Sequence, residues 1–403
     1  MPGPLEGIKV VDLSAVVSGP LCTMMMADQG AEVIKIEAHG VGDVLRLPNF
    51  ARGGLSAFFA NNNRGKRSIV LDLSMPEGRE IVHKLVRDAD VFVQNWRPGA
   101  VDRAGLGEAD LRAINPDLIY CSISGYGPSG PYAQRRVYDP IIQGLSGHTS
   151  VQMNPEVPIR DLVRNIVSDK SSSYTAAQAI TAALFARERG AGGQHIVVPM
   201  LDASLAFFWC DGMIGHTFQG DDTPPGRALY DIYRLWETAD GHLMYFAATD
   251  SEFHGLFKAV EHPEWIDDPR YGTTEGRAVP ENFAELGELL MNEIRTRPTK
   301  ELIERMAAED VPVGPVLTLD ELESDPQIQH NEAILEFEHP TAGRFRQARP
   351  AARFDKTPQN PRRRLPPLHG EHTREVLQEL GYSEEDLERM QKEGLIPEPV
   401  PTD

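Results

Sequence analysis

Residues 8–124 alternate short apolar runs with helix-like segments, and this alternation limits the fold more than any other feature of the sequence. Runs typical of buried strands occupy residues 8–13, 31–37, 67–73, 90–95 and 117–124. Because helix-like segments lie between several of these runs, we predict an α/β fold in which helices cover both faces of a parallel sheet. Pro20 and Gly30 follow the usual start and stop preferences of the first of these helices.

A different pattern begins near residue 230. The stretches YRLWET and LMYFAA flank the turn ADGH, which predicts two strands joined around an Asp-Gly pair, and helix-like segments follow as far as Ala308. We therefore expect a smaller α+β domain at residues 227–330. Residues 1–199 would form a large domain, residues 200–226 a linker that begins helically, and the Pro- and Arg-rich residues 331–365 a second linker.

Composition and charge restrict the class of partner. The 403 residues are 41% hydrophobic and 25% charged, as in an ordinary globular protein. A formal net charge of -20 opposes binding to phosphate backbones and anionic lipid, so we expect neither nucleic acid nor a membrane as a partner. Cys22, Cys121 and Cys210 lie far apart, which predicts no disulfide framework and favours a reducing cytoplasm. We expect no secretion leader, lipid anchor or membrane span.

Asp169 stands between the apolar run NIV and an Ala-rich helix that we predict to end near Arg189. Two interpretations fit a carboxylate at this place. It could cap the helix by accepting hydrogen bonds from free backbone N–H groups, which is a common use of Asp. It could instead act as a nucleophile, and this stretch alone does not decide between the two.

Two motifs suggest ligands that the surrounding sequence does not support. GYGPSG at residues 125–130 matches the dinucleotide pattern, but Pro128 and Pro131 bracket a turn and no amphipathic helix follows. HGEH at residues 369–372 places two His residues near Glu371, yet no third cluster with ligand spacing accompanies them. We therefore predict a turn, a helix start and no metal site.

Polar and aromatic residues follow several of the predicted strands, at the edge where open α/β sheets bind ligands. Guanidinium groups suit phosphate oxygens, and an indole ring can stack on a base. The pattern therefore predicts a nucleotide-like ligand at this edge. The residues concerned are Val17 and Ser18 after the first strand, Ser74 after the third, and Trp96, Arg97 and Arg103 after the fourth.

Beyond these single features, ordered blocks of the sequence resemble the class III (CaiB/BaiF-type) CoA transferases, such as formyl-CoA and carnitine CoA transferases. The blocks within residues 4–205 include PLEGIKVVDLSAVVSGPLCTMMMADQGAEVIKIE, NNNRGKRSIVLDLS, ADVFVQNWRPGAVDRAGLG and INPDLIYCSISGYGPSGPYA. The likeness resumes at TADGH, VPVGPV and HGEHTREVLQELGYSEEDL.

The resemblance implies a Rossmann-like large domain built from both ends of the chain, to which residues 366–403 return, with the small domain inserted. It also implies an interlocked homodimer whose linkers pass around the partner. Asp169 would be the catalytic nucleophile. CoA would contact Val17, Ser18, Leu71, Asp72, Leu73, Ser74, Asn95, Trp96, Arg97, Arg103, Arg136, Val137, Tyr138 and Asp139.

The implied reaction is transfer of CoA from an acyl-CoA to a small carboxylic acid, through an anhydride and then a CoA thioester on Asp169. Acyl-CoA is then a substrate, and no permanently bound cofactor is expected. Backbone N–H groups of residues 125–130 and near Ser171 are the expected oxyanion donors.

The sequence also departs from this family pattern. Ala38 follows IKIE where formyl-CoA transferases place an Arg, and residues 219–230 lack a glycine-run loop, so formyl and oxalyl substrates are not expected. Tyr138 stands where the related acyl-CoA racemases place a His that they need for α-proton transfer, which favours CoA transfer. An acyl-CoA racemase or isomerase and a non-catalytic CoA-binding protein are the alternatives.

Overall fold

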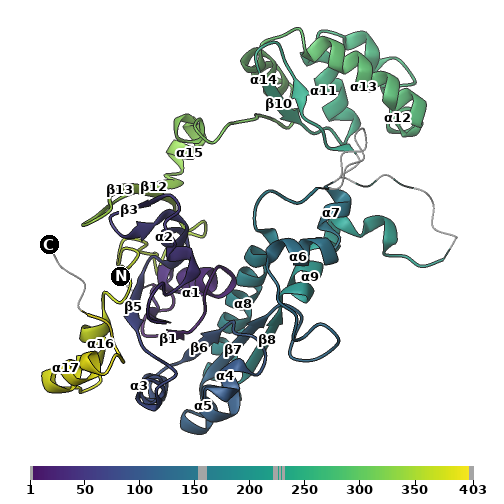
Figure 1. The fold of residues 1–403 in the computed structure, drawn as a ribbon. Helices are drawn as coiled ribbons and strands as arrows, with labels where there is room; N and C mark the ends of the chain where they lie inside the picture. Colours follow the sequence, from purple (N-terminus) through teal and green to yellow (C-terminus); the bar gives the residue numbers. More distant parts are fainter. Residues whose placement is uncertain (1–2, 153–160, 221–225, 227, 229–231, 399–403) are drawn as a thin grey trace. The chain divides into compact units, whose positions relative to one another are not determined.

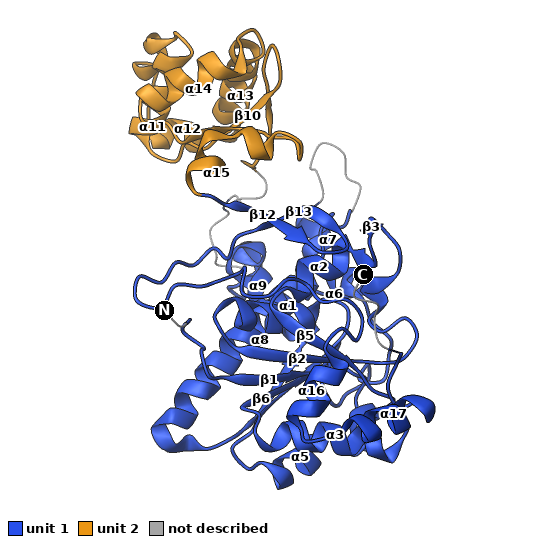
Figure 2. Cartoon of the chain, turned by 90° about the vertical axis from the view of Figure 1, so that its left-hand side faces the viewer, with its two compact units in different colours: residues 1–228, 332–403 blue, residues 229–331 orange. Residues whose placement is uncertain are grey.

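The computed structural model describes residues 3–152, 161–220, 226, 228 and 232–398. The chain divides into two compact units, and Figure 2 shows each in its own colour. The large unit combines residues 1–228 with residues 332–403, and the small unit spans residues 229–331. The chain thus leaves the large unit and returns to it after the small unit is complete.

A six-stranded parallel sheet forms the centre of the large unit (Figure 1). This sheet confirms the predicted α/β class. Its order, β5-β2-β1-β6-β7-β8, is the Rossmann order, in which the strand order reverses between β1 and β6. The strands are β1 (Lys9–Asp12), β2 (Glu32–Glu37), β5 (Lys66–Val70), β6 (Val91–Gln94), β7 (Ile119–Ser124) and β8 (His195–Pro199).

Helices cover both faces of this sheet because successive strand residues point to opposite sides. Val10 belongs to one buried apolar cluster and its neighbour Val11 to the other. The Val10 cluster includes side chains of α1 (Ser18–Asp28), α6 (Asp139–Leu145), α8 (Val167–Ala186) and α9 (Met200–Gly212). The Val11 cluster includes side chains of α3 (Pro76–Arg87), α4 (Ala100–Arg103), α5 (Glu108–Ile114), α16 (Thr373–Glu379) and α17 (Glu384–Lys392).

Shorter elements complete the large unit. The turn η1 (Val44–Arg46), the pair β3 (Ala51–Arg52) and β4 (Leu55–Ser56), and α2 (Ala57–Asn63) lie between β2 and β5, and α7 (His148–Val151) follows α6. The strands β12 (Ile334–His339) and β13 (Gly343–Ala348) form an antiparallel hairpin. Arg64 connects this hairpin to α1, because its guanidinium bonds both Asp28 and the carbonyl of Ala348.

The small unit contains a three-stranded antiparallel sheet in the order β11-β10-β9. The predicted strands around the Asp-Gly turn are β9 (Trp236–Glu237) and β10 (His242–Tyr245), and β11 is Val313–Pro315. Its own apolar core joins Leu243, Leu256 and Leu290. The helices are α11 (Asp250–Ala259), α12 (Thr274–Ala278), α13 (Pro280–Ile294), α14 (Thr299–Ala308) and α15 (Pro326–His330).

Both segments expected to be linkers contain regular structure. Residues 200–212 form helix α9, with Ser204 fully buried, because the apolar side chains of Met200, Ala203 and Phe208 recur at helical spacing and pack inward. Residues 334–348 form the β12–β13 hairpin. Within the described ranges, no helix combines the length and the apolar character needed to cross a bilayer.

Candidate functional site

A pocket of about 420 Å³ opens where the carboxyl ends of β1, β2, β5 and β6 meet. Ligands of open α/β sheets bind at this edge, beside the reversal of strand order. The pocket therefore lies where the sequence places a nucleotide-like ligand. Its lining residues are Leu13, Ser14, Ala15, Lys35, Ile36, Glu37, Ala38, His39, Gly42, Asp43, Leu71, Asp72, Leu73, Ser74 and Trp96.

The turn after β5 supplies four of the residues expected to contact CoA, Leu71 to Ser74. The Asp72 carboxylate accepts hydrogen bonds from both the backbone N–H and the hydroxyl of Ser74, at 2.8 and 2.6 Å. These bonds close a tight turn and lower the pKa of Asp72. The Asp72 N–H in turn donates to the carbonyl of Leu395, so the C-terminal residues help to shape the pocket.

The turn after β6 supplies Asn95, Trp96 and Arg97. The Asn95 amide bridges to the neighbouring turn, where it bonds the N–H and the carbonyl of Ala15 and the hydroxyl of Ser18. Trp96 lines the pocket, whereas Arg97 and Arg103 are exposed. Neither guanidinium forms an ion pair or hydrogen bond with the residues that the structure describes, which leaves both free to bind an anion.

Val17 and Ser18 are almost completely buried at the start of α1, with 1% and 3% of their surfaces exposed. Val17 belongs to an apolar cluster with Leu45 and Phe59, and Ile166 packs against the same cluster. Ile166 is the residue immediately before helix α8. The turn expected to contact CoA is therefore packed against the entrance of the helix that carries Asp169.

The segment Arg136–Asp139 divides into exposed and buried residues. Arg136 and Tyr138 are exposed, and Val137 packs against the Val10 cluster. Asp139 is buried, and its carboxylate accepts from the Gln143 amide at 2.6 Å and from the backbone N–H of Ser168 at 2.8 Å. Among the described residues the Asp139 carboxylate is occupied by hydrogen bonds within the protein, although the family resemblance places it among the CoA contacts.

Asp169 is the third residue of α8, inside its first turn. The capping interpretation is wrong, because Ile166 occupies the N-cap position and the cap bonds come from another element. Asp139 accepts from the N–H groups of Ser168 and Asp169, at 2.8 and 3.2 Å. These N–H groups are therefore not free as oxyanion donors, and the Gly127 N–H is likewise bonded to the Ser124 hydroxyl.

Asp169 exposes 8% of its surface. Its carboxylate has no hydrogen bond or ion pair to the residues that the structure describes. Burial raises the pKa of Asp169 to about 7, and the negative charge of Asp139 adds to the rise. A carboxylate with a raised pKa is a stronger base and nucleophile than an ordinary one. Near pH 7 a large share of the molecules carries it ionised and unpaired.

A buried polar network lies beneath the N-terminus of α8. The Ser204 hydroxyl of α9 is within 3.0 Å of the hydroxyls of Ser146 and Ser168 and within 3.2 Å of a ring nitrogen of His148. Burial lowers the pKa of His148 despite the nearby Asp139. The network connects α7, α9 and the end of α6 to the first turn of the helix that carries Asp169, and no sequence pattern predicts it.

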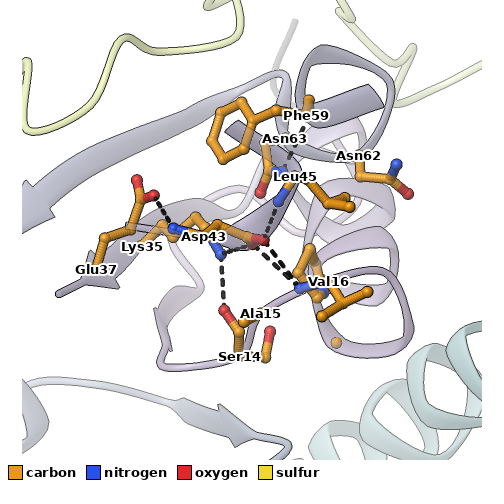
Figure 3. Close-up of polar contacts among 12 residues, drawn as sticks. Ser14, Ala15, Val16, Lys35, Glu37, Asp43, Leu45, Phe59, Asn62 and Asn63 are labelled. Carbon is orange, nitrogen blue, oxygen red and sulfur yellow. Dashed lines mark hydrogen bonds and ion pairs between the residues drawn. The ribbon is translucent and has the colours of Figure 1, made fainter. Parts of the chain in front are cut away.

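The wall of the pocket on the β1–β2 side carries buried, paired charges, which Figure 3 shows in part. Lys35 and Asp43, which line the pocket, form an ion pair at 3.1 Å. Lys66 and Asp12, which are not lining residues, form another at 2.9 Å, and all four side chains are fully buried. Sequence reasoning missed them, although a Lys between two apolar residues of a buried parallel strand, IKI, is a usable indication. Such a Lys must find a buried partner.

The two rejected motifs hold no ligand geometry. Gly127 and Gly130 adopt φ angles of 91° and 98° in a turn, and no helix follows before α6, so residues 125–130 do not form a dinucleotide loop. A ring nitrogen of His369 bonds the Ala38 carbonyl, and one of His372 accepts from the Ser68 N–H. In the described part of the chain no group of His, Cys, Asp or Glu has metal-site geometry.

The fold and the site define an α/β protein of the Rossmann type, with a ligand pocket at the carboxyl edge of its sheet. The profile of CoA-transferase family III matches residues 5–373, and the chain belongs to this family. It is therefore an enzyme of the CoA-transferase class, which moves CoA between acyl-CoA thioesters and carboxylic acids.

Relatives and solved structures agree with this assignment. Succinyl-CoA:glutarate CoA-transferase of Mus musculus is 35% identical over 98% of this chain and 90% of its own length. Formyl-CoA:oxalate CoA-transferase of Escherichia coli O139:H28 is 32% identical over 98% of this chain and 100% of its own. A CAIB/BAIF family protein from Brucella suis superimposes with a TM-score of 0.81 and 30% identity, over 94% of this chain and 100% of its own.

Proposed function

We propose that the enzyme transfers CoA by covalent catalysis on Asp169. The observation that carries this proposal is the Asp169 carboxylate itself, buried and unpaired, with its pKa raised to about 7 at the start of α8. Structural carboxylates are normally paired or hydrogen-bonded when buried. An unsatisfied carboxylate beside a ligand-binding turn instead fits a group that forms and breaks bonds.

Each step exchanges one bond for another at a carbonyl carbon. A carboxylate oxygen of Asp169 attacks the thioester carbon of the donor, the C–S bond breaks, and CoA leaves as a thiolate with a mixed anhydride on Asp169. The thiolate attacks the side-chain carbonyl carbon of Asp169 and releases the donor acid. The acceptor carboxylate attacks this aspartyl thioester, the C–S bond breaks, and CoA leaves again as a thiolate with a second mixed anhydride on Asp169. The thiolate then attacks the acceptor acyl carbon of that anhydride. This last step frees Asp169 and the new acyl-CoA, and no net proton is consumed.

The CoA ester would occupy the pocket at the sheet edge. Trp96 offers an aromatic face, and Arg97, Arg103 and Arg136 are exposed cations for its phosphates. Val17 and Ser18 support the turn between the pocket and α8. Glutarate, the acid named for the Mus musculus relative, makes short dicarboxylic acids the first acceptor class to test.

A homodimer is part of the proposal. The helices α6, α8 and α9 expose large apolar side chains, which a soluble surface rarely leaves uncovered in such number. A second copy would cover them, interlocked through the connections between the two units. The exposed side chains are Tyr138, Ile141, Leu145, Tyr174, Phe185, Phe207 and Trp209. Light scattering after size exclusion should give the mass of a dimer, and a stable, active monomer would refute this part.

The reaction is tested by offering a panel of short acids with succinyl-CoA or acetyl-CoA and identifying the CoA esters by mass spectrometry. A new acyl-CoA that requires the acceptor acid supports transfer. Exchange of the α-proton without any acceptor would support the racemase or isomerase alternative. CoA binding without turnover of any donor would support the non-catalytic alternative.

The covalent step is tested separately. Enzyme incubated with an acyl-CoA and then with hydroxylamine should carry a hydroxamate at Asp169, because anhydrides and thioesters react with this reagent and free carboxylates do not. Asp202→Asn, which changes an exposed carboxylate of α9, serves as the matched control and should label normally. Turnover with no modification at Asp169 would refute the aspartyl mechanism.

A further inference from the structure

The turn between β1 and α1 contains an unusual backbone conformation. Val16 has a φ of 67°, in the left-handed region. A β-branched residue is rarely found there, because its side chain crowds the adjacent carbonyl groups. Such a conformation persists only where the surrounding structure holds it, and it is often found at functional sites.

Asp43 holds Val16 in this conformation. Both carboxylate oxygens accept from the Val16 N–H, at 3.1 and 3.2 Å, and one also accepts from the Leu45 N–H at 3.0 Å. Figure 3 shows these bonds converging on the Asp43 side chain. Asp43 comes from the segment after β2, so the contact joins the ends of two neighbouring strands.

Lys35 also restrains the turn, through Asp43 and through the carbonyl of Ser14. Its ammonium group pairs with Asp43 at 3.1 Å and donates to the Ser14 carbonyl at 2.7 Å. The pair therefore forms hydrogen bonds to the carbonyl of Ser14 and to the N–H of Val16, the residues on either side of Ala15. Asn95 bonds Ala15 itself at both its N–H and its carbonyl.

The restrained turn touches both halves of the site. Ser14 and Ala15 line the pocket at the sheet edge. Val17, which follows the strained residue, lies in the apolar cluster against which Ile166 packs, directly before α8. A change in the turn would therefore be felt at the pocket and at the helix entrance that presents Asp169.

We propose that Asp43, paired with Lys35, is a positioning residue that keeps the Ser14–Val17 turn in the conformation that binds the CoA ester. This inference rests on the proposed function, since it takes the pocket to be the CoA site. In this view the strain at Val16 is balanced by the Asp43 bonds. Without those bonds the turn relaxes, and only a fraction of molecules remains competent to bind.

The test uses coenzyme A as the probe and isothermal titration of the full-length protein. In Asp43→Asn one oxygen and the charge are lost, and if the competent fraction falls to about one tenth, the apparent Kd for CoA rises about tenfold. Asp28→Asn is the matched control, because Asp28 also forms a buried pair, with Arg64, but does not contact the turn. It should leave the Kd within about twofold of wild type, since the competent fraction is unchanged.

Rescue separates positioning from general damage. Glycine adopts a positive φ without steric cost, so Val16→Gly needs no outside restraint to hold the turn. The double variant Val16→Gly with Asp43→Asn should recover at least about half of the lost affinity on a logarithmic scale, because glycine raises the competent fraction again. A merely structural role of Asp43 predicts no such recovery.

Four results would overturn the inference. An Asp43→Asn protein that binds CoA as tightly as wild type would refute it and leave the proposed function intact. Equal losses in Asp28→Asn and Asp43→Asn, or a double variant no better than Asp43→Asn, would assign the effect to lost stability. Failure of the wild-type protein to bind CoA at all would refute the proposed function, and the inference with it.

Discussion

The large unit buries carboxylates in two regions, and their pKa values shift in opposite directions. On the β1–β2 side, Asp12 is fully buried, yet Lys66 and Lys35, with hydroxyls of Ser14 and Thr23, lower its pKa well below the ordinary value. At the start of α8 neither Asp139 nor Asp169 forms an ion pair with a described cation, and the neighbouring Lys170 bonds Asn165 instead. Burial there raises the pKa of Asp169 to about 7.

The difference shows how one domain keeps structural carboxylates apart from a reactive one. Burial by itself disfavours the charged form in both regions, and the presence or absence of a lysine decides the outcome. Asp12, with its two lysines, keeps its charge at any ordinary pH. The unpaired carboxylate stays near its titration point, where a small change in environment changes its reactivity.

The largest expected effect belongs to the unpaired region. Asp169→Asn keeps the shape of the side chain and removes the attacking oxygen anion, so transfer should fall by at least about a thousandfold, equivalent to about 4 kcal/mol of transition-state stabilisation. Initial rates and CoA titrations measure the loss and the retained binding. Full activity, in protein shown by mass spectrometry to be free of deamidation, would show that the unpaired Asp169 carboxylate is not the nucleophile.

In the paired region the large effect should be on stability. Asp12→Asn leaves Lys66 and Lys35 buried with one counter-charge fewer, which should lower the free energy of unfolding by about 3–5 kcal/mol. Denaturant titration measures the change. Glu77→Gln, which breaks the more exposed pair with Arg389, is the control and should cost less than about 1 kcal/mol. Similar costs for the two variants would contradict the role given to the buried pairs.

The unpaired carboxylate should make the protein less stable as pH rises. The folded pKa of Asp169 is raised from 3.8 to about 7, so the folded state favours the proton, and wild type loses stability between these pH values as the unfolded state ionises first. Asp169→Asn avoids this loss. It should match wild type below pH 4 and exceed it above pH 7 by at most about 4 kcal/mol.

Unfolding titrations at pH 4, 6 and 8 test this sign. Asp202→Asn, at an exposed carboxylate, should follow wild type at each pH. An Asp169→Asn protein that is less stable than wild type at pH 8 would show that Asp169 has a stabilising partner.

The smallest expected effect on activity concerns the interaction between the Asp139 and Asp169 carboxylates. Asp139→Asn removes a negative charge near Asp169 and lowers its pKa, so the rise of kcat/KM with pH, expected near pH 7 in wild type, should move to lower pH. The oxygen of Asn can still accept from the α8 N–H groups, but its NH2 replaces the oxygen that accepts from Gln143, so the free energy of unfolding should fall by about 1–3 kcal/mol. An unchanged pH profile would mean that burial alone sets the pKa of Asp169.

Much of the fold follows from local pattern. Strands β1, β2, β5, β6 and β7 coincide within a few residues with apolar runs, because a strand buried on both faces needs continuous apolar side chains. The helix predicted to begin at Asp169 begins at Val167. The residues around Leu71 to Ser74 and Trp96 come together at one edge, as parallel strands require.

What the sequence could not reveal are contacts between distant residues. Nothing near Asp169 announces that Asp139, 30 residues earlier, caps its helix and leaves its carboxylate unpaired. Asp43 lies in an irregular segment and resembles an ordinary turn residue, and only the packed structure places it beneath Val16. Local composition predicts that residues 200–212 begin helically and continue as a linker. They form a complete helix because they pack against α6 and α8, and local composition does not describe that packing.

The bond between the Asp72 N–H and the Leu395 carbonyl, joined by His39 at the same oxygen, has a consequence for synthesis. The first half of the sheet can pair as soon as it leaves the ribosome, but this edge of its pocket closes only when Leu395 arrives. At about 5–20 residues per second, the roughly 320 intervening residues take about 15 to 65 s. Every newly made chain therefore passes through a period in which the lining residues of its pocket are present but the Leu395 bond to Asp72 and His39 is not.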